Sequence, residues 1–137
     1  MKVFLDTNVL VSAFATRGLS ADVLRAVLTE RDLVTSEDVL TELRRVLRKK
    51  LSVPAHTVGE ILAMLGSNHV ESCPSDFEPV GLRDHSDERI LAAVIAAVSD
   101  VLVTGDKDLL EVSKSMKGIR IVSPRGFWEL IGTGKST

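Results

Sequence analysis

Two apolar runs in this 137-residue sequence end in acidic residues. The run 3–5 is followed by Asp6, and the run 101–103 is followed by Thr104, Gly105 and Asp106. Each run is typical of a strand buried on both faces of a parallel sheet. Sites in such sheets form where the strands reach their carboxyl ends. We therefore expect the two carboxylates at one rim of the sheet, partly shielded from water.

Neighbouring carboxylates at such a rim repel each other. Two unit charges ~4 Å apart interact by about 4 kcal/mol at an effective dielectric of 20, against about 1 kcal/mol in water. The repulsion either destabilises the fold or raises one pKa. A hard divalent cation resolves the conflict, because Mg²⁺ and Mn²⁺ prefer oxygen ligands. The two acids therefore indicate a divalent-metal site.

Two further acids, Asp87 and Glu42, can reach the same rim. Asp87 lies in the first turn of a helix expected to begin at Ser86, where the helix dipole favours an anion. Glu42 flanks the apolar stripe of another expected helix, and a partly buried carboxylate needs a partner. Taken singly, each acid also has a structural interpretation as a strand end, helix start, turn or cap residue. Glu42 could instead form a surface pair with Arg45.

The elements that must position these acids alternate along the chain. Apolar runs predict strands at 3–5, 33–35, 101–103 and 119–122, with a further short strand near Val70 in an otherwise irregular loop. Residues at helical spacing predict helices in six segments: 20–28, 36–47, 54–65, 86–98, 109–112 and 124–131. Strands alternating with helices imply an α/β fold. We expect a three-layer α/β/α sandwich with a central parallel sheet of about four or five strands.

Length and composition restrict the class of protein. A chain that is 45% hydrophobic and 26% charged is typical of one globular domain. We expect that domain over residues 1–131, with 132–137 as a flexible C-terminal tail. The net charge of −2 excludes binding of nucleic acid by bulk attraction, so such a site would need a local basic patch. The single cysteine and the lack of secretory or membrane-spanning runs predict a cytoplasmic protein.

Four segments together resemble the PIN-domain ribonuclease family, of the kind found as VapC-like toxins in toxin–antitoxin pairs. The motifs are VFLDTNVL at 3–10, a lone Glu42, DHSDERILAA at 84–93 and VTGDKDLL at 103–110. Their order and spacing cover nearly the whole chain. The resemblance implies a PIN-like fold and a nuclease that uses Mg²⁺ or Mn²⁺ to hydrolyse RNA phosphodiester bonds.

The same resemblance implies roles for individual residues. The catalytic and metal-binding residues would be four acids: Asp6, Glu42, Asp87 and Asp106. Asp84 competes with Asp87 for the third position, and Asp87 is preferred because it immediately precedes the apolar helix face at 90–91. Supporting roles would fall to three further residues: Asn8, Thr104 and Asp108.

A basic run follows Glu42 and bears on the partners. Its members are Arg44, Arg45, Arg48, Lys49 and Lys50. They form either an RNA-binding patch beside the site or a solvated helix end where cations favour the dipole. The resemblance further implies a protein antitoxin and a homodimer or higher oligomer. Residues that could line a groove for the antitoxin, or instead pack in the core, are Leu10, Val11, Ala13, Phe14 and Leu19.

Two alternatives use the same acids differently. A haloacid-dehalogenase-like phosphatase also has a strand-end aspartate and a later Gly-Asp motif, but it needs a second aspartate two residues after the first, where this chain has Asn8. The other alternative is a non-catalytic module that binds RNA or an antitoxin, with the acids serving only the structure.

Overall fold

Five parallel strands form the central sheet of the computed structural model, which describes residues 1–135. The order across the sheet is β3-β2-β1-β4-β5, and every neighbouring pair is parallel. The strands are β1 (Lys2–Leu5), β2 (Asp32–Ser36), β3 (His69–Glu71), β4 (Val101–Val103) and β5 (Arg120–Val122). The predicted parallel sheet is therefore confirmed, including the short strand expected near Val70.

Helices cover the central strand β1 on both faces, and its apolar side chains are therefore buried. The side chains of Val3, Phe4 and Leu5 are fully buried, as expected for a central parallel strand. Leu5 pairs with Val103 of β4, so the two strands end side by side. The backbone N–H of Asp6 donates to the Val103 carbonyl at 3.0 Å. This bond fixes the first residue after β1 against the end of β4.

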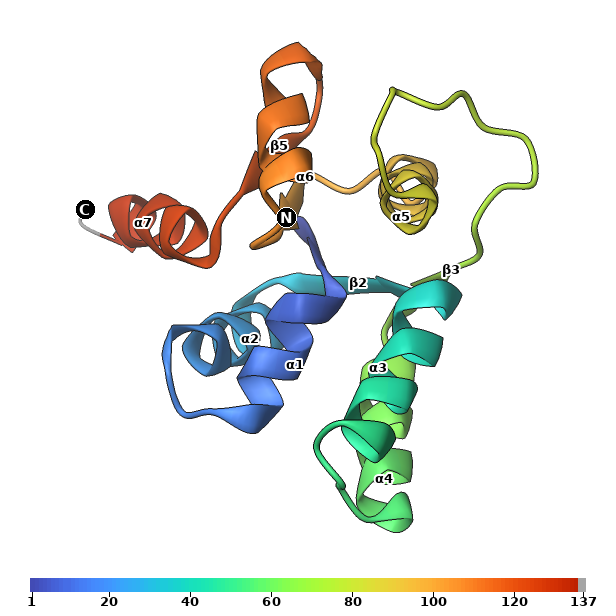
Figure 1. Cartoon of the computed structure of the whole chain (residues 1–137). Helices are drawn as coiled ribbons and strands as arrows, with labels where there is room; N and C mark the ends of the chain where they lie inside the picture. The colour runs from blue at the N-terminus through green and yellow to red at the C-terminus, as the bar shows by residue number, and fades with distance from the viewer. Residues whose placement is uncertain (136–137) are drawn as a thin grey trace.

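Helices on both faces make the three-layer α/β/α sandwich that the sequence predicts (Figure 1). In Figure 1, α1 to α4 lie on one face, and α5 and α6 lie on the other. The side changes because the strand order reverses after β3, and right-handed crossovers then run over the opposite face. The helices are α1 (Thr7–Ala15), α2 (Leu19–Glu30), α3 (Glu37–Lys49), α4 (Ala55–Gly66), α5 (His85–Ala96), α6 (Lys107–Val112) and α7 (Pro124–Lys135), with a 3₁₀ turn at Ser113–Ser115.

Two helix starts differ from the expected ones. α2 begins at Leu19 rather than after a cap at Ser20, because Leu19 packs against the core and extends the helix. α5 is capped by Asp84, whose carboxylate accepts the Ser86 N–H at 2.8 Å. Ser86 therefore lies inside the first turn of α5, and Asp87 lies in the same turn.

The C-terminal helix is longer than expected. Residues 132–135, predicted as the start of a flexible tail, continue α7 to Lys135. Residues 136–137 of that expected tail lie outside the described residues. Phe127 is fully buried and Ile131 nearly so, and α7 packs against α2. Packing of this apolar face stabilises a helix whose glycines would weaken it in isolation.

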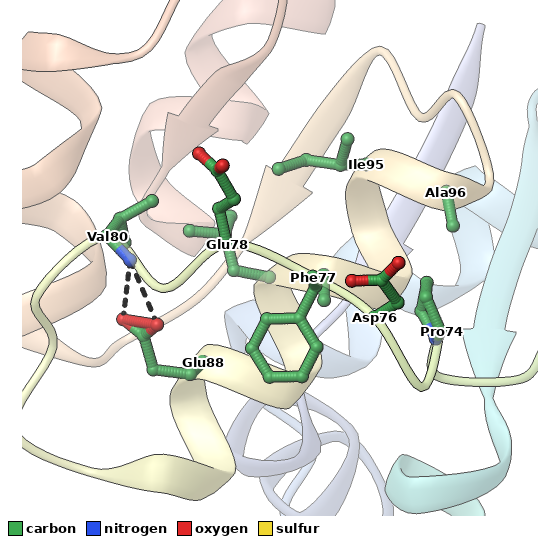
Figure 2. Close-up of a pocket in the computed structure, with 10 residues that line it drawn as sticks. Pro74, Asp76, Phe77, Glu78, Val80, Glu88, Ile95 and Ala96 are labelled. Carbon is green, nitrogen blue, oxygen red and sulfur yellow. Dashed lines mark hydrogen bonds between the residues drawn. The ribbon is translucent and has the colours of Figure 1, made fainter.

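A buried acid, Glu88, ties the loop before α5 to that helix. Glu88 is only 6% exposed. Its carboxylate accepts the Val80 N–H at 2.9 and 3.1 Å and the Leu82 N–H at 2.8 Å. Figure 2 shows the carboxylate reaching Val80 beside the ring of Phe77. The sequence gives no signal for this role, because two adjacent acids in a first turn simply suit the helix dipole.

Replacing Glu88 with alanine should destabilise the fold. The substitution leaves the N–H groups of Val80 and Leu82 without their charged acceptor, and we expect a loss of about 3 kcal/mol in the free energy of unfolding. Urea unfolding measures this value. Glu111→Ala, at an exposed acid of α6, is the control and should change stability by less than about 0.5 kcal/mol. Equal effects of the two substitutions would show that the tether contributes nothing.

Candidate active site

The four predicted acids face one hollow at the carboxyl ends of β1 and β4, here called the acidic hollow. Its volume is about 420 Å³, and α1, α3 and α5 contribute to its walls. Asp6 comes from the end of β1, Glu42 from α3, Asp87 from α5 and Asp106 from the end of β4. The other lining residues are Thr7, Asn8, Val11, Ser12, Val46, Asp84, Ser86 and Ile90. Segments distant in the sequence therefore bring their carboxylates to one place.

Asp6 is the most deeply held of these acids. It is 4% exposed, and one carboxylate oxygen accepts the Thr7 N–H at 2.7 Å. The other oxygen accepts the Thr104 hydroxyl at 2.7 Å and the Asn8 amide at 3.4 Å. Burial raises the pKa of Asp6, the hydrogen bonds from Thr104 and Thr7 oppose this rise, and the charges of Asp106 and Glu42 add to it.

Thr104 and Asn8 join the ends of β1 and β4. The Thr104 hydroxyl donates to Asp6 and accepts the Asp106 N–H at 3.0 Å, so one fully buried side chain bridges two acids. The Asn8 side-chain oxygen accepts the Gly105 N–H at 3.2 Å. Two of the three predicted supporting residues, Asn8 and Thr104, thus hold the rim in place.

Asp106 is fixed as the cap of α6. One of its carboxylate oxygens accepts the Asp108 N–H at 2.8 Å and the Leu109 N–H at 3.2 Å. Asp108, the third predicted supporting residue, does not line the acidic hollow. Its carboxylate instead accepts a hydrogen bond from Arg83 at 2.9 Å, and this contact raises the pKa of Arg83.

Asp87 and Glu42 line the hollow, but no hydrogen bond or ion pair within the described residues fixes their carboxylates. Neither carboxylate makes a hydrogen bond or ion pair within residues 1–135, so the alternative surface pair of Glu42 with Arg45 does not form. Partial burial, followed by the charges of Asp106, Asp84 and other nearby acids, raises the pKa of Asp87 to about 7. The hollow therefore holds more negative charge than its surroundings compensate.

Asp84 and Asp87 both line the hollow, but their surroundings differ. Asp84 is exposed and is engaged as the cap of α5. Asp87 is half-buried and has no such engagement. The geometry therefore leaves Asp87 the freer of the two to act on a bound group.

The donor set fits a hard divalent cation. The carboxylates supply oxygen ligands, which Mg²⁺ and Mn²⁺ prefer. The buried hydroxyl of Thr7, a residue of the same lining, has no hydrogen-bond partner in the described part of the chain. Within residues 1–135, no three of the histidine, cysteine, aspartate and glutamate side chains are grouped closely enough to hold a metal ion as they stand. The side chains thus match a cation in charge and ligand type without being preassembled around one.

The five basic residues after Glu42 have different surroundings. Arg45 lines a groove that adjoins the acidic hollow. Arg48 donates to the Val53 carbonyl at 3.1 Å and so secures the turn after α3. The remaining three are exposed near the end of α3: Arg44, Lys49 and Lys50.

The apolar residues considered for an antitoxin groove mostly serve the core. Leu10 and Ala13 are buried within it. Phe14 and Leu19 are partly buried and pack against it, as does Val11 at the edge of the acidic hollow.

A sequence model of the PIN domain matches residues 2–108. Because this match covers most of the chain and contains all four acids, the chain belongs to the PIN-domain family. No curated protein matches the chain. Among residues 1–135, no helix combines the length and the apolar character needed to cross a membrane.

Solved structures with a similar fold include two VapC proteins. VapBC2 from Rickettsia felis, bound to a DNA fragment of its promoter, gives a TM-score of 0.61 at 16% identity, over 90% of this chain and 98% of that one. VapC20 of Mycobacterium tuberculosis, a toxin that cleaves the sarcin–ricin loop, gives a TM-score of 0.55 at 17% identity, over 77% of this chain and 91% of that one. The PIN-domain endonuclease Utp24 gives a TM-score of 0.53 at 20% identity, over 89% of this chain and 84% of that one. At these identities the likeness shows the fold.

The raised pKa of Asp87 should appear in the pH dependence of stability. Its pKa rises from an ordinary value of 3.8 to about 7 on folding, so the folded chain binds this proton more tightly than the unfolded chain. The resulting stabilisation is full below pH 3.8 and is lost as the pH rises through about 7. In EDTA, Asp87→Asn should therefore flatten the fall in unfolding free energy over this range, as measured by urea titrations. Asp32→Asn, at an exposed acid at the opposite end of the sheet, should retain the wild-type slope; identical slopes for all three proteins would contradict the assignment.

Divalent metal should stabilise the folded chain. Binding relieves repulsion in the folded state only, and metal at ten times its Kd stabilises by about 1.4 kcal/mol, which raises the Tm by about 5 °C. Differential scanning fluorimetry with millimolar Mg²⁺ or Mn²⁺ measures the shift. Asp32→Asn should keep it and Asp6→Asn should lose it. An unchanged wild-type Tm would argue against a shared metal site.

Proposed function

We propose that this protein is an endoribonuclease that uses Mg²⁺ or Mn²⁺ to hydrolyse RNA phosphodiester bonds. The observation that carries this proposal is the convergence of Asp6, Glu42, Asp87 and Asp106 on one hollow, with the pKa of two of them raised by burial and mutual repulsion. Membership of the PIN-domain family supports it. The fold likeness to VapC20, named as a toxin that cleaves the sarcin–ricin loop, and to the endonuclease Utp24 supports it further.

The proposed roles follow from how firmly each acid is held. Asp6 and Asp106, which are fixed by hydrogen bonds, would hold the metal directly or through water. Glu42 and Asp87 are unattached and would orient the attacking water or bind a second ion. A bound divalent cation would polarise the phosphate and lower the pKa of water. Thr104 would hold the Asp6 carboxylate beside the backbone of Asp106.

The reaction is a hydrolysis at phosphorus. The oxygen of water forms the new bond to phosphorus, the bond between phosphorus and the 3′ oxygen breaks, and the 3′ oxygen takes up a proton. The products are a 5′-phosphate and a 3′-hydroxyl.

The same proposal extends to the cellular setting. We propose that the enzyme is the toxin of a toxin–antitoxin pair in the cytoplasm, that it forms a homodimer or higher oligomer, and that a protein antitoxin covers the acidic hollow. The support is the fold likeness to VapBC2 and VapC20.

Metal-dependent cleavage that requires Asp6 tests the proposal. Purified protein is incubated with labelled single-stranded RNA and Mg²⁺ or Mn²⁺, with EDTA as the metal-free control. We expect cleavage by the wild type and by Asp32→Asn. Asp6→Asn should lower the rate by about 100-fold or more, the loss typical when one preorganised electrostatic group is removed.

Each alternative has its own outcome in this experiment. Cleavage that survives EDTA or the Asp6→Asn substitution would refute the mechanism. Turnover of a phosphomonoester without RNA cleavage would indicate the phosphatase. RNA binding without any turnover would indicate the non-catalytic module.

A further inference from the structure

A second hollow, here called the α3–α5 groove, extends the acidic hollow sideways. Its volume is about 400 Å³. The two hollows share Glu42, Ser86 and Ile90, so they adjoin each other. The residues that only the groove has are Asp38, Thr41, Arg45 and Arg89. Two arginines therefore stand beside a site that is otherwise acidic.

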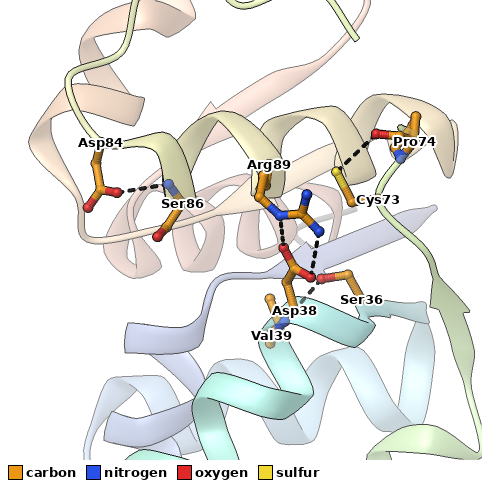
Figure 3. A network of polar contacts seen from close by, with 8 residues as sticks. All are labelled: Ser36, Asp38, Val39, Cys73, Pro74, Asp84, Ser86 and Arg89. Carbon is orange, nitrogen blue, oxygen red and sulfur yellow. Dashed lines mark hydrogen bonds and ion pairs between the residues drawn. The ribbon is translucent and has the colours of Figure 1, made fainter. Parts of the chain in front are cut away.

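Arg89 forms a rigid wall of the groove. From α5 its guanidinium donates to both carboxylate oxygens of Asp38 on α3, through Nε at 2.6 Å and Nη2 at 3.1 Å. Figure 3 shows this pair bridging the two helices. Such two-point contacts fix the guanidinium plane. Its Nη1 makes no hydrogen bond within residues 1–135 and remains available as a donor.

Arg45 supplies the uncompensated positive charge of the groove. It follows Glu42 by three residues on α3, which places both on the same face of the helix. Its guanidinium is exposed and makes no ion pair or hydrogen bond in the described part of the chain. Arg83, a cation close enough to Asp106 for the two charges to interact, is already paired with Asp108.

We infer that RNA leaves the acidic hollow through the α3–α5 groove, with Arg45 binding the phosphate next to the scissile one. This inference rests on the proposed nuclease function and adds the direction of the substrate strand. A polyanion that enters a hollow of carboxylates needs a cation close by, and Arg45 lies within one helical turn of Glu42. The Nη1 of Arg89 offers a second donor from the opposite wall.

The other large hollow beside α5 does not suit RNA. It is mainly apolar, and its charged lining residues are all acidic: Asp76, Glu78 and Glu88. Figure 2 shows these carboxylates around the ring of Phe77. A phosphate backbone would be repelled there, whereas the α3–α5 groove offers the two arginines Arg45 and Arg89.

Binding of a short fluorescent single-stranded RNA tests the groove. Asp6→Asn serves as the non-cleaving background, and fluorescence anisotropy gives Kd between about 50 and 200 mM NaCl. Adding Arg45→Ala should raise Kd about five- to tenfold and reduce the salt slope by about 0.7, the value for one phosphate contact on a single strand. Arg44→Ala removes the same charge from an exposed residue that does not line the groove, and it should change both quantities much less.

Steady-state cleavage separates this inference from the nuclease proposal. In otherwise wild-type protein, Arg45→Ala should raise KM with kcat within about twofold, because the contact lies away from the reacting bond. Arg45→Lys should restore part of the loss, and unchanged Tm values confirm folding. If the wild type cleaves RNA but Arg45→Ala behaves like Arg44→Ala, the groove is refuted and the nuclease stands. If RNA binding depends on Arg45 but no cleavage occurs, the groove stands and the nuclease falls.

Discussion

Repulsion between carboxylates at the ends of β1 and β4 is the constraint on which the candidate site depends. The fold tolerates it because residues 3–5 of β1 and 101–103 of β4 are apolar and buried, so burial of the sheet outweighs the electrostatic cost at its rim. The Thr104 hydroxyl, hydrogen-bonded to both Asp6 and Asp106, couples the two strand ends directly. The carboxylates of the site therefore lower the stability of the fold, and the buried sheet beneath them supplies the stability that offsets this repulsion.

Three acids at the start of α5 show how surroundings divide the work among similar side chains. Asp84 caps the helix, Glu88 anchors the preceding loop, and only Asp87 is left without a hydrogen-bond partner in the described chain. The first two contacts order the loop and the first turn, and so they hold the backbone that carries Asp87. The unattached carboxylate is then free to respond to a bound cation or water.

Apolar runs and helical spacing were enough to predict the sheet, its parallel pairing and most helices, since these depend on which residues must be buried. The convergence of the four acids followed from the strand ends and from the family resemblance. Other features depend on tertiary contacts that no local pattern encodes. These include the helix α1, which is not among the predicted segments, the extension of α7, the tether at Glu88, and the position of Arg45 in a groove beside the acidic hollow. The Arg89–Asp38 pair is of the same kind, because its partners lie 51 positions apart.

The pairing of β1 with β4 also determines when the site can exist. Asp6 and Thr104 are separated by 98 positions, and closing so long a loop precedes any gain from the contact. Because Asp6, Glu42 and Asp87 all precede β4 in the chain, a chain that has not yet added β4 to the sheet carries three of the acids without the strand that brings them together. A nuclease built in this way would have no assembled site until β4 has joined the sheet beside β1.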